Sequence, residues 1–562
     1  MAIADFEEIF FHIGGFGRFQ LSLFVVSCVV NIFMSAVYYG QIFMTLTPPH
    51  WCRPPPEVSS LNLTTDEVKL LTLPRTTQHS SEYDSCVIYD VDFVEIVTSN
   101  ETWPNASWPT TTCANGWSYN YSLYYPTITS ELDWVCDEDW RPVMAQSLFF
   151  VGSMFGSTAF GWAADRWGRL PILVLANVVG AVAGMASAFS NGFIIFVIIR
   201  FIVGMTYEQH YSIAYVLMLE YVGKEYRTLL ANTPILLFLT ASNCALPWIA
   251  LAIGDWFFLT LAMYAPLLFS ILFFCMVPES ARWLISQGRV EDTIKIFERA
   301  ADLNGKILSQ EVIQDFRAYG EKQAAIAEGQ GRVSVLDLLK TPVLRKRFLI
   351  LGLMWIVMTL AYDGHMRNTE NIGSNAFVSF TVLSIVELPA DIVVIFLMEW
   401  LGRRYTTVVS LFACGFAGLA IMLVPEDNSN TILTLAMVGC FLITMAINVG
   451  MQYQVEVLPT VARSQGMGTI QTVTFCAALS SPFIVHLSKY GYFLPYLVLG
   501  ILTFVGGTVC MFLPETLGEN IPNTLEDGET FFTNQGFCFN PCKRKRKNET
   551  EFVAEQTEVT RF

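Results

Sequence analysis

Apolar stretches that are long enough to cross a lipid bilayer recur along most of the chain. A helix needs about 20 predominantly apolar residues to span ~30 Å of hydrocarbon. Such stretches lie near 20–45, 143–164, 171–190, 193–220, 229–252, 256–277, 348–369, 375–398, 405–424, 432–456, 464–486 and 491–512. Because backbone groups in lipid must pair within their own segment, we expect these stretches to be helices. The sequence therefore predicts an all-α membrane protein with twelve transmembrane helices.

Composition and motifs exclude several classes of function. Hydrophobic residues make up 53% of the chain and charged residues only 15%, whereas soluble domains carry about 25% charged residues. The G-x-x-x-x-G-K-S/T motif of ATP-driven pumps is missing, and the histidines (12, 50, 79, 210, 365 and 486) show no metal-binding spacing. We expect no enzyme activity, no cofactor, no metal and no nucleic acid. The lipid bilayer is one expected partner.

Basic residues mark one side of the membrane. The short connections on that side carry Arg166, Arg169, Lys224, Arg227, Arg403, Arg404 and Arg463. The stretch 279–347 adds twelve Lys and Arg, and the tail adds KRKRK at 543–547. By the positive-inside rule this side is cytoplasmic, and twelve spans place both termini there. We expect a multi-pass protein of the plasma membrane.

The long connection 46–142 is then extracellular, and its chemistry agrees. It carries N-x-S/T glycosylation sequons at Asn62, Asn100, Asn105 and Asn120, although a further match at Asn548 falls in the tail. It also holds Cys52, Cys86, Cys113 and Cys136, an even number in an oxidising compartment, which allows three disulfide pairings. Residues 46–140 contain fourteen acidic and three basic side chains. Two interpretations fit this charge: a solvated, glycosylated cap, and a field that enriches cations near the mouth.

Three charged motifs recur in the same order at nearly one spacing. The pairs are DRWGR at 165–169 with EWLGR at 399–403, EYVGKEYR at 220–227 with EVLPTVAR at 456–463, and VPES at 277–280 with LPET at 513–516. Such a repeat predicts two pseudo-symmetric six-helix halves with a binding site at the midplane between them. We divide the chain into a first half (1–278, which includes the loop 46–142), a cytoplasmic helical segment (279–347), a second half (348–518) and a cytoplasmic tail (519–562).

Some of these motifs resemble those of known transporters. The stretch at 161–171, GWAADRWGRLP, is similar to the loop signature of the major facilitator superfamily. More narrowly, the chain resembles the organic cation, organic anion and carnitine transporter family in GGFGRFQ (14–20), PESARWLISQGR (278–289), VELP (386–389) and LPETLG (513–518), and its details are most similar to invertebrate members. The match covers roughly residues 10–520. It implies the major facilitator fold, alternating access, and the disulfides Cys52–Cys113 and Cys86–Cys136.

The repeated motifs predict a gate at the cytoplasmic helix ends. In the first half the cluster consists of Asp165, Arg166, Arg169, Glu220 and Arg227, and its counterpart in the second half consists of Glu399, Arg403, Glu456 and Arg463. Acidic partners at matched positions favour a gate over a purely topological role of the basic residues. Such ion pairs are expected to hold the inner side closed while the site faces out, and to separate as the halves rock.

A carboxylate lies near the middle of the fourth span. Glu208, Tyr211 and Tyr215 are spaced i, i+3, i+7 and share one helix face. Ionisable residues at this depth are candidates for a functional site; protonation, or pairing with His210 or another helix, is the structural alternative. The cation carriers of the family have a lysine at the corresponding position, so a glutamate makes this cavity more negative than theirs.

Other spans contribute further candidates for substrate binding. The resemblance places Trp355 and Tyr362 of the seventh span in the cavity, and Glu387 precedes Pro389 in the eighth. Asp363 lies nearer the outer end, where both an interfacial position and a role as counter-charge fit. Neutral hydrogen-bonding groups come from Tyr38, Gln41, Asn448 and Gln452. In the eleventh span Phe475 stands where the cation branch has an acidic residue and the anion and carnitine branches have arginine, so this position does not discriminate.

The combined hypothesis is an alternating-access carrier for a small organic cation or an amine-bearing zwitterion, such as carcinine or carnitine-like betaines. Aromatic side chains suit an ammonium or imidazole group, and Glu208, Glu387 and Asp363 are the expected counter-charges. An organic anion exchanger is the alternative, but the sequence shows no Lys or Arg placed mid-span for it. A receptor that binds without transporting is a further alternative, and a coupling ion stays open.

Overall fold

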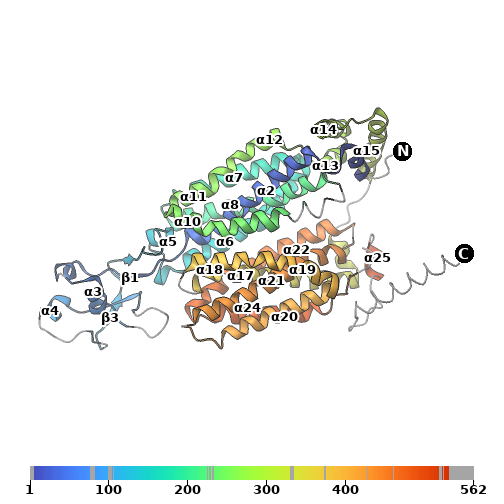
Figure 1. Ribbon diagram of the computed structural model, residues 1–562. Helices are drawn as coiled ribbons and strands as arrows, with labels where there is room; N and C mark the ends of the chain where they lie inside the picture. The colour runs from blue at the N-terminus through green and yellow to red at the C-terminus, as the bar shows by residue number, and fades with distance from the viewer. Residues whose placement is uncertain are drawn as a thin grey trace.

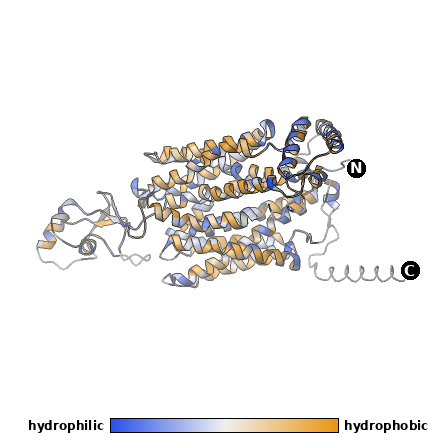
Figure 2. Cartoon of the chain, turned by 45° about the horizontal axis from the view of Figure 1, so that its top comes forward, coloured by the Kyte–Doolittle hydropathy of each residue, from blue (hydrophilic) through white to orange (hydrophobic). Residues whose placement is uncertain are grey.

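The computed structural model describes residues 6–530 apart from 62, 76–82, 99–103, 106, 224–225, 227–229, 231–232, 330–334, 373–374, 427, 460, 518–521 and 523–524. Within these residues, nine helical segments are long and apolar enough to cross a membrane, two shorter apolar helices accompany them, and α17 completes the set of twelve. Figure 2 shows hydrophobic residues along the length of the bundle helices. The prediction of an all-α membrane fold is confirmed.

The spans of the first half are α2 (Arg18–Met44), α6 (Trp140–Trp167), α7 (Arg169–Ser187), α8 (Phe193–Glu220), η4 with α10 (Pro234–Leu239 and Thr240–Ile253), and α11, η5 and α12 (Trp256–Tyr264, Ala265–Leu272 and Phe273–Met276). Those of the second half are α17 (Pro342–Arg367), α18 with α19 (Ala376–Ile385 and Glu387–Leu401), α20 (Arg403–Ile421), α21 (Ser429–Val457), α22 with α23 (Arg463–Ala478 and Ser481–His486), and α24 (Leu494–Cys510). In Figure 1 the first half lies above the second.

Small residues allow α6 and α8 to pack closely. A Cβ added at Gly156 of α6 would lie 1.9 Å from the carbonyl oxygen of Met205, and one added at Gly204 of α8 would lie 2.0 Å from that of Phe149. Helices in lipid associate through such close packing, because lipid tails are as apolar as the side chains they replace. These glycines therefore fix the distance between the two helices.

The segment between α2 and α6 folds into a small domain with two disulfides, at the left of Figure 1. Two antiparallel pairs form it: β1 (His50–Cys52) with β4 (Trp117–Tyr119), and β2 (Val87–Tyr89) with β3 (Thr110–Thr112). Short helices surround them: η2 (Pro56–Leu61), α3 (Thr65–Thr72), α4 (Phe93–Thr98), α5 (Ile128–Glu131) and η3 (Cys136–Glu138). The disulfides are Cys52–Cys113 and Cys86–Cys136, the pairs that the resemblance implied. We call this side of the bundle the disulfide end.

The opposite side, which we call the basic end, carries a second helical layer. It consists of η1 (Phe6–Glu8), α1 (Ile9–Ile13), α13 (Ala281–Ser286), α14 (Val290–Leu303), α15 (Gln310–Gly329), α16 (Val335–Lys340) and α25 (Leu525–Thr530). Asn304 explains the GGFGRFQ motif: its Oδ1 accepts from the backbone N–H of Phe19 (3.0 Å), and a Cβ at Gly17 would lie 2.2 Å from that oxygen. The motif thus fastens the start of α2 to the end of α14.

Aromatic side chains join the two halves near the disulfide end. The ring of Phe43 on α2 stacks on Phe377 of α18 (centroids 6.0 Å apart) and meets Phe380 edge-on (5.1 Å). Tyr39 packs against Phe380 as well (5.3 Å). On the other side of the bundle, the Ser147 hydroxyl of α6 donates to the carbonyl of Leu479 after α22 (3.0 Å). These contacts join the two halves of the bundle.

Candidate functional site

Glu387 lies inside the bundle at the start of α19. Pro389 lacks the N–H that would bond back to residue 385, which is why the eighth span breaks between α18 and α19 and presents Glu387 at a helix start. The side chain is only 5% exposed. Its Oε1 accepts a hydrogen bond from the hydroxyl of Tyr362 on α17 (2.7 Å), and Asn243 of α10 lies beside it. No described Lys or Arg pairs with this carboxylate.

A second acidic group follows one turn later. Asp391 accepts from the amide of Asn448 on α21 (2.5 Å), and the same amide donates to the carbonyl of Thr444 (3.0 Å). Asn448 therefore orients a carboxylate that the sequence hypothesis did not include. The i, i+4 spacing of Glu387 and Asp391 was the available signal, since it puts both on one helix face.

Asp363 is fully buried inside the protein. Both of its oxygens accept from Nε of Arg367 (2.8 Å), and Oδ1 also accepts from the hydroxyl of Tyr38 on α2 (2.9 Å). The Arg367 guanidinium lies over the rings of Tyr38 (5.1 Å) and Phe150 (5.2 Å). Asp363 is therefore already neutralised and is a weaker counter-charge than Glu387. Arg367, the last residue of α17, thus brings a basic group next to Asp363 from the end of its span, where the search for a mid-span Lys or Arg did not look.

Glu208 of α8 is half-buried, and no described residue hydrogen-bonds or ion-pairs with its carboxylate. Tyr211 and Tyr215 share its helix face, with ring centroids 5.4 Å apart. The alternative of pairing with His210 finds no support: the His210 ring lies near the Thr206 hydroxyl instead (3.5 Å). An acidic group at this depth without a cationic partner is what a site for a cation requires.

The remaining candidates differ in their hydrogen-bond partners. Gln41 is buried with neither amide atom hydrogen-bonded to a described residue, and the indole N–H of Trp355 is likewise unpartnered. Phe475 belongs to the apolar cluster that Tyr38 and Tyr362 pack against. Gln452 is different: its amide donates to Glu456 (2.8 Å), which attaches it to the basic end.

At the basic end, the first-half motifs meet in one cluster. Arg169 forms an ion pair with Glu220, and Glu220 also accepts from the hydroxyl of Ser280. Glu279 accepts from the backbone N–H of Arg169 (2.8 Å). Gly168 is required here, because its φ is +103° and a Cβ would lie 2.4 Å from the Glu279 carboxylate. The cluster therefore joins α7, α8 and the turn after α12.

The second half repeats this arrangement contact for contact. Arg403 Nε lies 3.2 Å from Glu456 Oε2, and the hydroxyl of Thr516 donates to Glu456 (2.5 Å). Glu515 accepts from the backbone N–H of Arg403 (2.8 Å), beside Gly402 with φ +86°. These ion pairs join helices of one half to each other. As observed, they brace each half and do not bridge the two.

The other predicted gate residues lie at or beyond the edges of these clusters. Asp165 and Arg166 are exposed, and Arg166 stacks over Trp162 (5.5 Å). Glu399 lies 3.8 Å from Arg403, and Arg463 donates to the carbonyl of Leu458 (3.2 Å). Arg227 falls outside the described residues, as do the sequons at Asn62 and Asn100; Asn105 and Asn120 are both exposed.

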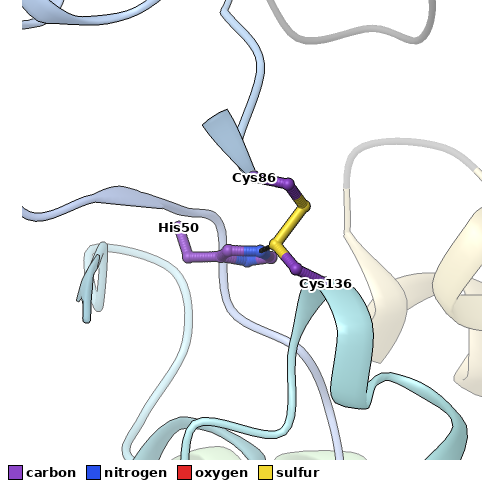
Figure 3. Close-up of side chains that lie close together, drawn as sticks. All are labelled: His50, Cys86 and Cys136. Atoms are coloured by element: carbon purple, nitrogen blue, oxygen red, sulfur yellow. Dashed lines mark hydrogen bonds between the residues drawn. A yellow bond between two sulfur atoms is a disulfide. The ribbon is translucent and has the colours of Figure 1, made fainter. Parts of the chain in front are cut away.

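One group in the disulfide domain has the composition of a metal site. His50, Cys86 and Cys136 place their ligand atoms within 4.8 Å of one another. Figure 3 shows the two sulfurs joined in a disulfide, with the His50 ring beside Cys136 (4.0 Å). Metal ligation requires thiolates, so this group cannot bind a metal while oxidised. Burial lowers the pKa of His50 below its ordinary value of 6.5 and favours the neutral ring.

Comparisons with known proteins agree with this architecture. The model of the family "Sugar (and other) transporter" matches residues 80–526. The human organic cation/carnitine transporter 2 is 30% identical over 525 residues, which cover 93% of each chain. The carcinine transporter of Drosophila melanogaster is 29% identical over 544 residues, 95% of this chain and 80% of that protein.

Among solved structures, the inward-open xylose transporter XylE of E. coli has the same fold, with a TM-score of 0.56 at 14% identity over 89% of this chain and 98% of its own. All of these proteins are transporters and not enzymes. The chain therefore belongs to the sugar and other transporter family of the major facilitator superfamily, and within it to the group of the organic cation and carnitine transporters.

Proposed function

We propose that the chain is a plasma-membrane carrier that moves small organic cations or amine-bearing zwitterions by alternating access. One observation carries the substrate class. Glu208, Glu387 and Asp391 lie within membrane-spanning helices, and no described Lys or Arg pairs with any of them. A carboxylate held in low dielectric without a cation is costly. A cationic substrate removes that cost when it binds.

The surroundings of these groups suit an ammonium ion. Tyr38 and Tyr207 pack with centroids 5.0 Å apart, and the Tyr362 hydroxyl orients Glu387. Aromatic faces attract a desolvated cation by roughly 0.5–2 kcal/mol. The names of the relatives point the same way, to organic cations, carnitine and carcinine. We favour carcinine-like amines and carnitine-like betaines as substrates.

Charge and covalent chemistry support an orientation in the membrane. Disulfides persist in oxidising compartments, and Asn105 and Asn120 are exposed on the same domain. Arg169 and Arg403 lie at the other end, as the positive-inside rule expects of the cytoplasmic side. We propose that the disulfide end is extracellular, that both termini are cytoplasmic, and that 1–278 and 348–518 are the moving halves.

The two ion-pair clusters at the basic end refine the gate hypothesis. Because Arg169–Glu220 and Arg403–Glu456 join helices within a half, they keep each half rigid at its basic end. Rigid halves can rock as units around a central site. We propose that the clusters gate the inner side by holding the helix ends in register, so that their loss slows turnover more than it weakens binding.

Uptake measurements test the proposal. Cells or proteoliposomes with the protein are offered a quaternary amine, a betaine and a dicarboxylate, each with and without sodium. We expect saturable uptake of the amine and the betaine only; the sodium arm reveals a coupling ion. Preferred uptake of the dicarboxylate supports the organic anion exchanger instead, for which Arg367 is the basic group. Binding without accumulation indicates a receptor.

A further inference from the structure

A cavity of about 440 Å³ opens between the halves at the disulfide end. Its wall includes Ile42 of α2, Gln146 of α6, and Pro482 and His486 of α23, with the Cys86–Cys136 disulfide above. Arg367, the last residue of α17, forms part of its inner wall. The cavity therefore lies on the outer side of the group formed by Tyr38, Asp363 and Arg367.

The Arg367 guanidinium has unused hydrogen-bonding capacity. The side chain is 6% exposed, and its Nε is committed to Asp363 (2.8 Å). Nη1 and Nη2 are buried and have no hydrogen-bond partner among the described residues. Leaving the N–H groups of a buried cation unpaired is costly. The planar fork of arginine matches a carboxylate, which accepts two parallel hydrogen bonds.

A second unpartnered donor lies on the same cavity. Gln146 is 7% exposed, and its Nε2 has no described partner. The other charged groups on the wall are mutually engaged: Lys489 lies 2.5 Å from Asp139, and His486 lies 3.7 Å from it. His50 completes the titratable groups of the wall. The buried side-chain donors on this wall that lack a described partner are therefore those of Arg367 and Gln146.

We propose that the outer guanidinium edge of Arg367, with the Gln146 amide, is a subsite for the carboxylate of a zwitterionic substrate. The inference rests on the proposed transport of cations and deepens it. Tyr362 precedes Arg367 by five residues, about 7.5 Å along the axis at ~1.5 Å per residue. We place the carboxylate of the substrate at Arg367 and its ammonium group deeper in the bundle, toward Glu387, the partner of Tyr362. The subsite makes the carrier prefer zwitterions to simple cations of the same shape.

The test compares γ-butyrobetaine with its primary amide, which keeps the ammonium group and the shape but lacks the carboxylate. Uptake is normalised to surface protein, and the ratio of the two KM values is the readout. In Arg367→Gln we expect the KM of the betaine to rise relative to that of the amide by roughly ten- to a hundredfold, the range of a charge-assisted hydrogen bond. Gln146→Leu should shift the ratio in the same direction by roughly three- to tenfold, as for one neutral hydrogen bond.

Two further variants keep the test decisive. Arg367→Gln leaves Asp363 without its cation, so the double variant Asp363→Asn with Arg367→Gln provides a neutral pair if the single variant fails to reach the surface. Lys489→Gln removes a different positive charge from the same wall and should leave the ratio unchanged. A wild-type ratio in both Arg367 variants overturns the subsite. An equal shift in Lys489→Gln overturns it as well, because general electrostatics would then explain the preference.

Replacing chloride by gluconate separates the substrate carboxylate from an inorganic anion at Arg367. Betaine and amide uptake should both be indifferent to chloride; equal dependence of both on chloride overturns the assignment. Failure of the proposed function looks different. If the wild type accumulates neither compound, the carrier hypothesis fails together with the subsite. If the wild type accumulates the amide and the Arg367 variants leave the ratio of the two KM values unchanged, only the subsite fails.

Discussion

Replacing Glu387 by glutamine is the sharpest test of the cation site. The substitution keeps the size of the side chain and leaves an amide oxygen to accept from the Tyr362 hydroxyl, which is 2.7 Å from the carboxylate. Because no described cation pairs with Glu387 and its side chain is only 5% exposed, the main change is the loss of a buried negative charge. The local packing should therefore survive.

The expected loss of affinity follows from the burial. Two unit charges 4 Å apart attract by about 4 kcal/mol at an effective dielectric constant of about 20. Desolvation of the substrate and of the carboxylate offsets much of this. A net ~1–3 kcal/mol remains for a charge-assisted contact, which corresponds to about a 5- to 150-fold weaker affinity. Surface expression should hold, since the variant removes an unpaired buried charge.

Competition binding on surface-normalised protein measures the effect. The ligands are choline and its uncharged isostere, in which a tert-butyl group replaces trimethylammonium. We expect Glu387→Gln to weaken choline and to leave the isostere nearly unchanged, while Glu426→Gln, an exposed carboxylate of the same half, alters neither. Equal weakening of both ligands in Glu387→Gln would refute the counter-charge role and indicate a structural one.

Three other substitutions test separate parts of the molecule. Glu208→Gln should also weaken choline more than its isostere, with a normal surface level; poor expression with unchanged affinity would contradict the role. Gly156→Ala puts a Cβ 1.9 Å from the Met205 carbonyl oxygen and should cost ~1–3 kcal/mol, seen as a lower melting temperature in detergent, whereas Gly161→Ala meets nothing within 4 Å and should be neutral. Burial lowers the pKa of His50 in the folded disulfide domain, so the unfolded domain binds more protons than the folded one just below pH 6.5. The resistance of the folded domain to protease should therefore fall as the pH drops through 6.5, and His50→Gln should abolish that fall.

The spans were predictable from the sequence because the thickness of a bilayer sets their length. The fourth span, expected at 193–220, is observed at Phe193–Glu220. The first and seventh are observed at Arg18–Met44 and Pro342–Arg367, against 20–45 and 348–369. The seventh begins earlier because Arg345, Lys346 and Arg347 continue the helix out of the apolar region, which an apolarity criterion does not detect.

The side-chain partners were harder to predict, because periodicity gives the face of a helix but not the helix that it meets. Tyr362 and Glu387 were both candidates, yet only packing shows that α17 brings them together. Gln452 was a candidate because it lies four residues from Asn448 on the same span, but it bonds to Glu456 four residues later on that helix. The Asp363–Arg367 pair follows the i, i+4 rule and was readable from the sequence.

The internal repeat and the candidate site obey different constraints. At the basic end Arg169, Glu220 and Glu279 are reproduced by Arg403, Glu456 and Glu515, each set around a glycine with positive φ. These residues brace helices in both halves, so both copies need the same chemistry.

The charges in the middle and at the disulfide end do not repeat. The first half contributes the unpaired Glu208 and the buried Arg200, which donates to the Tyr264 hydroxyl (2.7 Å), whereas the second contributes Glu387, Asp391 and the Asp363–Arg367 pair. A small substrate with one cationic and one anionic end has no two-fold symmetry, so a site built for it cannot keep the symmetry of the repeat. The asymmetry of charge inside a symmetric frame fits an asymmetric ligand, and the betaine–amide comparison at Arg367 measures whether the carrier prefers a two-ended zwitterion to a simple cation.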